Sequence, residues 1–196
     1  RFPYELVSDL AELGLMGIPI PAEFEGGGAD TLAYAIAIEE LARVDQSFAI
    51  TVAAHTSLGT QPINLFGSDE QKREWLPQLA SGRRLAAFGL TEPGAGSDAG
   101  ATRTTARLEG GEWVVDGAKM FITNAGTEIS ALVTVTARTG ADEISNIVIE
   151  NGTPGYTQSA QLKKMGWRSS DTRELVFAGC RVPEGNLLGP RGNGLR

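Results

Sequence analysis

The stretch "FGLTEPGAGSDAG", residues 88–100, carries the residue types that most clearly suggest ligand chemistry. Its glycines lack a Cβ atom, so backbone N–H groups can come close to an anion such as a phosphate. Ser97 adds a hydroxyl to the same turn. The alternative is a tight turn without a ligand, because glycine-rich turns are common in proteins.

Two familiar phosphate-binding loops do not fit this stretch. From Gly94 the spacing is G-x-G-x-x-x-G, and a predicted β-hairpin follows it. A dinucleotide-binding fingerprint instead needs a helix whose N-terminus takes the pyrophosphate. A P-loop is excluded as well, since no Gly-Lys-Ser/Thr is present. The loop alone therefore leaves the identity of its ligand open.

Composition excludes several other kinds of site. The net charge is −7 with only 17 basic residues, which argues against a nucleic-acid surface. Cys180 is the only cysteine, so we predict no disulfide framework and no metal site, and a reducing compartment would suit it. A Ser-His-Asp triad would have to use His55, the only histidine. No apolar run reaches the ~20 residues of a membrane span, and no signal peptide is recognised.

The first half of the chain has helical patterning. Helices are predicted over residues 1–14, 30–45, 46–66 and 68–82. Asp30 or Thr31 is the expected N-cap of the second helix. The third is apolar on most sides and should bend or end near Pro62. Ser68 and Gln71 have the spacing of a capping box at the start of the fourth.

After residue 85 the pattern changes to short strands. A hairpin is predicted over residues 104–118, with further strands at 131–138, 146–150 and 175–183. Turn residues and no helix separate them, which favours an antiparallel β-barrel or sandwich. The predicted class is α+β, with an all-helical domain at 1–85, a β domain at 86–189 and the start of a linker at 190–196.

Five separated segments of the chain resemble the acyl-CoA dehydrogenase family. They are "IPAEFEGGGAD" (20–30), "FGSDEQKREWLPQLASG" (66–82), "AAFGLTEPGAGSDAGATRTTA" (86–106), "WVVDGAKMFITNAG" (113–126) and "KKMGWRSSDTRELVFAGCRVPEGNLLG" (163–189). The resemblance implies an incomplete N-terminal helical domain and a whole middle β domain. The family's C-terminal four-helix bundle is expected to be absent from this chain.

The resemblance also implies an activity, the oxidation of an acyl-CoA to the trans-2-enoyl-CoA with FAD. In the family a carboxylate removes the α-proton while the β-hydrogen leaves as hydride to the flavin. The base is a glutamate on the bundle, so we expect it beyond Arg196. No catalytic residue is then expected among residues 1–196, which should form an inactive, aggregation-prone piece of a longer protein. The alternatives are an acyl-CoA oxidase or another flavoenzyme on the same scaffold, and a non-enzymatic lipid-binding or scaffold module.

By resemblance, two segments would hold FAD. Leu90 and Thr91 would meet the pyrimidine edge of the flavin, and Gly96 and Ser97 its pyrophosphate. In the second segment Phe121 stands where many relatives carry Trp. The full expected set is Phe88, Gly89, Leu90, Thr91, Gly96, Ser97, Phe121, Ile122 and Thr123. Because residues i and i+2 share a strand face, Phe121 and Thr123 should face the flavin and Ile122 should point away.

The substrate would lie beside Ser97 and along one helix. Thr51, Ala54, His55 and Leu58 recur at helical offsets, and by resemblance that face lines the acyl-tail pocket. His55 has an alternative interpretation as a structural histidine satisfied by a neighbour.

Other polar and aromatic residues receive structural roles. Glu92 and Asp98 should bond nearby backbone groups or a basic side chain, since a carboxylate would repel a pyrophosphate. The loop Arg168–Ser169–Ser170–Asp171 is expected to be structural. Trp113 and Trp167 are expected to pack in the core or in a loop.

The resemblance further implies an electron-transfer flavoprotein as electron acceptor and a homotetramer built as a dimer of dimers. The expected compartment is the cytoplasm of a bacterium, or the mitochondrial matrix in a eukaryote, with a role in fatty acid or amino acid catabolism. Acyl-chain length and branching stay open.

Overall fold

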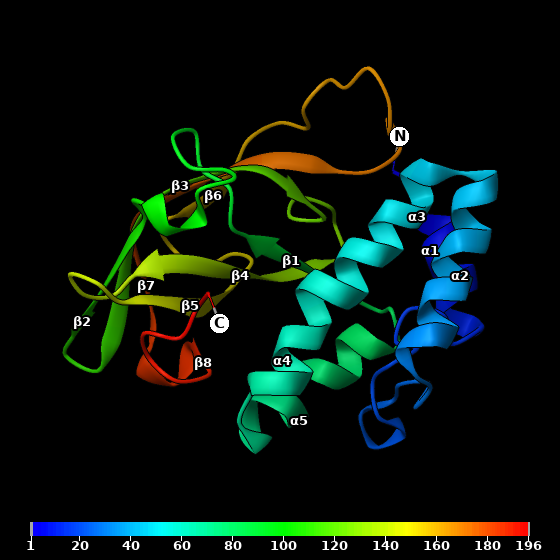
Figure 1. Ribbon diagram of the computed structural model, residues 1–196, viewed down its shortest axis with the longest axis horizontal. Coiled ribbons are helices and arrows are strands. Elements are labelled where there is room, and N and C mark those ends of the chain that lie inside the picture. Colours follow the sequence, from blue (N-terminus) through cyan, green and yellow to red (C-terminus); the bar gives the residue numbers. More distant parts are fainter. Residues whose placement is uncertain (1, 196) are drawn as a thin grey trace.

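A computed structural model describes residues 2–195 and shows a helical region beside a β domain (Figure 1). The helices are α1 (Tyr4–Glu12), η1 (Ala22–Phe24), α2 (Thr31–Val44), α3 (Gln46–Ala53), η2 (Ala54–Thr60), α4 (Gln61–Phe66), α5 (Asp69–Ala80), η3 (Ala99–Ala101) and η4 (Glu184–Asn186). The strands are β1 (Leu85–Gly89), β2 (Thr105–Glu109), β3 (Glu112–Thr123), β4 (Ser130–Arg138), β5 (Ile144–Glu150), β6 (Tyr156–Gln158), β7 (Thr172–Pro183) and β8 (Leu187–Leu188). This order confirms the α+β prediction.

The segment predicted to begin a linker, residues 190–196, is described as far as residue 195. It lies against the start of β5, where the Gly194 N–H donates to the Ile144 carbonyl at 2.8 Å and the Gly192 N–H donates to the Ser145 hydroxyl at 2.9 Å. Arg196 lies outside the described residues. The expectation that a catalytic glutamate follows Arg196 therefore stays a prediction.

Local sequence signals fix the starts of two helices as predicted. Asp30 is the N-cap of α2, and its side chain accepts a hydrogen bond of 2.8 Å from the N–H of Ala33. At α5 the capping box is complete, because the Ser68 hydroxyl accepts from the Gln71 N–H while the Gln71 side chain accepts from the Ser68 N–H. These bonds satisfy N–H groups that a helix start otherwise leaves unpaired.

The helical segment predicted over residues 46–66 changes type along its length. A π-helix, η2, separates α3 from α4, and its boundary with α4 lies at Gln61, next to Pro62, near which the helix was expected to bend or end. Pro62 sits in the first turn of α4, where a missing N–H costs little. The helix can lie close to β1 here because Gly59 has no Cβ atom. A Cβ at this position would lie 2.5 Å from the backbone oxygen of Ala86.

The sheet has the strand order β6-β7-β3-β2-β4-β5-β8, and β1 pairs with β4. The predicted hairpin is β2–β3, and its turn glycines, Gly110 and Gly111, have φ of 64° and 84°, as a two-residue hairpin turn of this kind requires. The antiparallel prediction omitted β1, which runs parallel to β4. This pairing places the end of β1 inside the sheet, where the glycine-rich loop begins.

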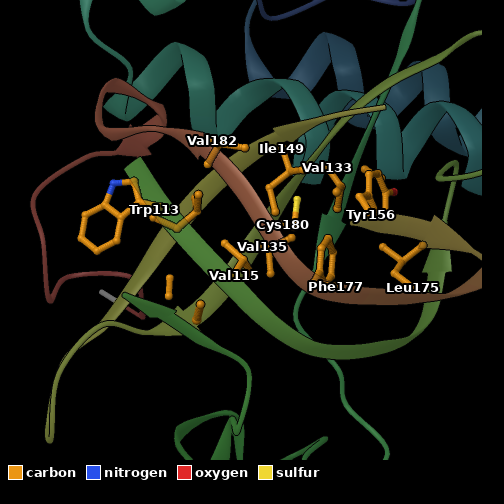
Figure 2. Close-up of a cluster of buried hydrophobic side chains, with 14 of the residues drawn as sticks. Trp113, Val115, Val133, Val135, Ile149, Tyr156, Leu175, Phe177, Cys180 and Val182 are labelled. Carbon is orange, nitrogen blue, oxygen red and sulfur yellow. The ribbon is translucent and has the colours of Figure 1, made fainter. Parts of the chain in front are cut away.

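The sheet curves around a core of aliphatic and aromatic side chains (Figure 2). Trp113 is buried there, as predicted, and its indole N–H donates to the Glu184 carbonyl. Tyr156 and Phe177 stack with ring centroids 5.0 Å apart. Cys180 is buried among these residues, and burial raises the pKa of its thiol to about 11.

The helical region leaves much apolar surface uncovered. No residue of α2 is buried, although the helix is largely apolar. The large exposed side chains on α2 and α4 are Leu32, Ile36, Val44, Leu65 and Phe66. An apolar helix face of this kind is a surface that another element would be expected to cover.

His55 joins the helices to the sheet from a fully buried position. Its Nδ1 accepts a hydrogen bond of 3.0 Å from the N–H of Ala86 in β1, and its Nε2 lies 3.0 Å from the carbonyl oxygen of Leu79 in α5. The neutral ring with its proton on Nε2 satisfies both bonds. Burial lowers the pKa of His55 to about 4, against an opposing effect of the bond to Leu79. His55 is therefore structural in this fold.

Stability should depend on pH through His55. Its folded pKa of about 4 lies below the ordinary value of 6.5, so its contribution is present above pH 6.5 and is lost as the pH falls through 4. His55→Gln removes the titration while keeping a donor and an acceptor. Between pH 7 and pH 4, the free energy of unfolding of the wild type should fall by about 3 kcal/mol more than that of the variant. Parallel pH curves in chemical denaturation would contradict this.

Candidate functional site

The two segments expected to hold a cofactor meet at one place in the structure. The loop after β1 lies against β3, where the Met120 N–H donates to the Thr91 carbonyl at 2.8 Å. The Lys119 ammonium donates to the Leu90 carbonyl at 3.1 Å. These two bonds hold the start of the loop, at Leu90 and Thr91, against the part of β3 that directly precedes residues 121–123.

The glycine-rich loop presents unused hydrogen-bond donors. Glu92 and Ala95 bridge each other's backbones, at 2.8 and 3.2 Å. Among residues 2–195, the backbone N–H groups of Thr91, Gly96 and Ser97 donate no hydrogen bond. Gly96 and Ser97 are exposed, and a Cβ on Gly96 would meet nothing within 4 Å. Open N–H groups on an exposed glycine turn fit an anionic ligand.

A buried ion pair lies directly beneath this loop. The Lys119 ammonium is 2.7 Å from Glu92 Oε1, and both side chains are almost fully buried. The Glu92 carboxylate also accepts from the Thr102 hydroxyl and from the N–H groups of Arg103 and Thr104. Burial alone raises the pKa of Glu92, but the bonds from Lys119 and the other donors outweigh it and hold that pKa at about 2. The structural role predicted for Glu92 is confirmed.

Asp98 does not follow the same prediction. Its side chain is exposed, and within residues 2–195 its carboxylate accepts no hydrogen bond. An exposed carboxylate needs no partner from the protein, because water solvates it.

Phe121 breaks the strand geometry on which its expected orientation was based. The pairing of β3 with β7 shifts register between Lys119 and Ile122, and Phe121 has φ of 62°. Such a bulge interrupts the alternation of side chains, so the argument from positions i and i+2 does not hold here. Ile122 is 3% exposed and packs in the β-domain core, while Phe121 is 61% exposed. How these side chains lie relative to a flavin stays a prediction. Thr123 is half-buried and pairs with Thr172.

Asn124 connects the end of β3 to α3, a role that was not predicted from the sequence. It is buried, its φ is 65°, and its side-chain amide donates to the Thr51 carbonyl of α3 at 2.9 Å. Its N–H donates to the Asp171 carbonyl. A left-handed turn ending a strand favours Asn, so the pattern "FITNAG" held the signal for a turn, although not for its partners.

The loop over residues 163–171 is held by its C-terminal end. Asp171 accepts from the Gly126 N–H at 2.9 Å and from Arg173 at 2.6 Å, and Ser170 is buried under the Lys164 ammonium. The structural role predicted for this end of the loop is confirmed. Trp167 is a loop residue but is half-exposed, with φ of 52° and its indole N–H 3.5 Å from the Gln46 side chain. Arg168 is exposed and donates to the Lys164 carbonyl.

The four residues expected on one helix face separate into two groups. Thr51, Ala54 and His55 are buried, whereas Leu58 is 52% exposed. Residues 54–60 form the π-helix, in which each residue advances by a smaller angle than in an α-helix, so the offsets used for the prediction do not apply. The polar groups of Thr51 and His55 are already bonded internally. Their place beside an acyl tail stays a prediction.

Neither a metal site nor a membrane span is seen in the described part of the chain. Over residues 2–195 no group of three or more His, Cys, Asp or Glu side chains is placed to hold a metal ion. None of the helices in that range combines the length and the apolar character needed to cross a bilayer.

The conformation of Phe121 generates a stability prediction. A left-handed backbone strains any residue with a Cβ, and the exposed phenyl ring makes little packing contact that could be lost. In the absence of added ligand, Phe121→Gly should be about 1 kcal/mol more stable than Phe121→Ala, because glycine alone relieves the strain. Chemical denaturation of the two variants measures the difference. Equal stabilities would mean that residue 121 does not hold this conformation in solution.

Comparison with known proteins matches both halves of the chain. The model of the acyl-CoA dehydrogenase N-terminal domain matches residues 1–83, and that of the middle domain matches residues 87–180. An acyl-CoA dehydrogenase of Bacillus subtilis is 45% identical, covering 99% of this chain and 52% of the relative. A short-chain specific acyl-CoA dehydrogenase of Clostridium acetobutylicum is 44% identical, and the match again covers 99% of this chain and 52% of the relative. The chain thus spans about half the length of these relatives.

Solved structures give the same result. An acyl-CoA dehydrogenase from Bacillus anthracis complexed with FAD is 42% identical with a TM-score of 0.91, over 97% of this chain and 32% of that one. A structure described as an electron transferring flavoprotein of Acidaminococcus fermentans is 42% identical with a TM-score of 0.94, and the match covers 99% of this chain and 52% of that one. The prolyl acyl carrier protein oxidase AnaB is 34% identical with a TM-score of 0.93, and the match covers 99% of this chain and 52% of that one. Matched in order by both domain models and by these structures, the chain belongs to the acyl-CoA dehydrogenase family.

Proposed function

We propose that the complete protein containing this chain oxidises an acyl-CoA to the trans-2-enoyl-CoA, using FAD. One observation carries the proposal. The glycine-rich loop with its unused N–H donors begins against β3: the Met120–Thr91 and Lys119–Leu90 bonds tie its first residues to the part of the strand that directly precedes the bulged, exposed Phe121. The solved FAD complex of the Bacillus anthracis relative supports the choice of cofactor.

The residues of this chain would bind and orient the cofactor. FAD, when bound, supplies the acceptor for the β-hydrogen of the substrate. Leu90 and Thr91 would hold its pyrimidine edge through backbone groups and the threonine hydroxyl. Gly96 and Ser97 would donate to its pyrophosphate, for which their open N–H groups are suited. Phe121 would cover one side of the ring, and Ser97 would also border the acyl-CoA.

The α-proton would be removed by a group outside this chain. A general base must titrate near the working pH and reach the proton. Glu92 is buried, accepts several hydrogen bonds and has a pKa held at about 2, so it cannot serve. Following the family resemblance, we propose that the base lies in a part of the complete protein beyond Arg196.

An oxidase is the second candidate, favoured by the similarity to the oxidase AnaB. The two differ in what reoxidises the reduced protein. Fast reoxidation by an electron-transfer flavoprotein and slow reoxidation by oxygen identify a dehydrogenase. Fast reoxidation by oxygen and slow reoxidation by the flavoprotein identify an oxidase.

As a dehydrogenase, the protein would work as a dimer of dimers in the bacterial cytoplasm or the mitochondrial matrix.

The activity itself is tested with the complete protein. Acyl-CoAs of increasing chain length are supplied with an artificial electron acceptor, and formation of enoyl-CoA is followed by its absorbance. Turnover of at least one thioester is expected. A flavin-free protein, or one that forms no enoyl-CoA from any of them, would contradict the proposal.

Ser97→Ala should weaken binding of FAD or of acyl-CoA. One hydrogen bond to a charged group contributes ~1.5–3 kcal/mol, which corresponds to roughly ten- to hundredfold in Kd. Titration of the complete protein with each ligand measures the effect. Ser8→Ala, an exposed serine in α1, is the control and should change neither affinity. Unchanged binding of both ligands by Ser97→Ala would remove Ser97 from the site.

A further inference from the structure

We infer that the Lys119–Glu92 ion pair is a positioning pair, which sets the backbone of the glycine-rich loop for the cofactor. The inference rests on the proposed function, since the ligand it concerns is FAD. Neither residue is expected to touch the cofactor. Both would act through the backbone of Leu90 and Thr91 and through the loop that follows.

Lys119 uses all three ammonium donors on groups of this loop and its return. The donors reach Glu92 Oε1 at 2.7 Å, the Leu90 carbonyl at 3.1 Å and the Thr102 hydroxyl at 3.1 Å. The residue is 1% exposed, so water does not compete for these donors. Because Lys119 lies two residues before Phe121 on β3, the same residue fixes both predicted cofactor segments relative to each other.

Glu92 fixes the other end of the loop. Its carboxylate accepts from the N–H groups of Arg103 and Thr104, at 2.7 and 3.0 Å, and from the Thr102 hydroxyl. Residues 93–101 therefore leave from Glu92 and return to it. Between these ends the loop has the bridge between Glu92 and Ala95, two backbone bonds within residues 98–102 and a 3.0 Å bond from the Arg138 guanidinium to the Gly100 carbonyl. Within the described residues Gly94, Gly96 and Ser97 make no hydrogen bond, so we infer that the position of this part of the loop is set mainly at Glu92.

A buried ion pair need not add much stability. Replacing both partners by neutral groups of similar volume is often neutral or stabilising, whereas removing one partner leaves a buried unpaired charge. The geometric role can therefore be separated from the stabilising role. A variant that removes both charges should keep the fold but lose the tie between Lys119 and the Leu90 carbonyl.

The experiment uses the complete protein with Lys119→Met and Glu92→Gln combined. The Kd for FAD should rise at least tenfold, and the visible absorbance of bound flavin should shift toward that of free flavin. The Tm without FAD should change by only a few degrees. Arg107→Met is the matched control, because Arg107 pairs with Asp116 between β2 and β3 of the same sheet but on an exposed surface. It should change neither the Kd nor the spectrum.

Several outcomes would overturn the inference while leaving the proposed function intact. One is a double variant that binds FAD with wild-type affinity and spectrum, whatever its Tm. If the double variant does not fold, Thr102→Val decides, since it removes one bond to each partner and keeps both charges. A severalfold rise in Kd then supports the inference, and an unchanged Kd overturns it. A separate outcome concerns the proposed function: if the wild-type protein itself binds no flavin, the proposed function fails, and the inference fails with it.

Discussion

Burying a lysine and a glutamate side by side costs solvation free energy, and the Lys119–Glu92 pair offsets this cost because every ammonium donor and both carboxylate oxygens find partners. Those partners are almost all backbone or hydroxyl groups of residues 90–104. The requirement to satisfy two buried charges thus dictates the path of the loop. The exposed Gly94 and Gly96 could not impose that path themselves, since within the described residues neither makes a hydrogen bond and a side chain at either position would meet almost nothing.

The helical region depends on similar buried polar contacts rather than on apolar packing alone. His55 connects η2 to both α5 and β1, and Asn124 connects the end of β3 to α3. A side chain that bonds the backbone of two other elements fixes their separation more narrowly than aliphatic contacts do. Because β1 leads directly into the glycine-rich loop, His55 and Lys119 lie at opposite ends of one short rigid segment.

The sequence was sufficient where the signals were local. Capping residues, the Gly-Gly turn and the change from helical to strand patterning predicted most elements and the α+β class. The resemblance of "FGLTEPGAGSDAG" and "FIT" to a known family located the two segments that the structure brings together. Sequence reasoning failed where tertiary contacts override local rules. The bulge at Phe121, the π-helix and the exposed position of Leu58 depend on neighbours far along the chain, as does the choice of Lys119 as the partner of Glu92.

The π-helix at residues 54–60 contains two residues, His55 and Gly59, that both contact β1, so the number of residues between these two contacts is fixed. Surface loops absorb an added or missing residue at small cost, because their ends are loosely held. Here both sides are held, since His55 bonds β1 and α5 while Gly59 lies against the backbone of Ala86. Removing one residue would return the segment toward α-helical pitch and turn either His55 or Gly59 away from β1. This helix should therefore vary in residue type among relatives far more readily than in length.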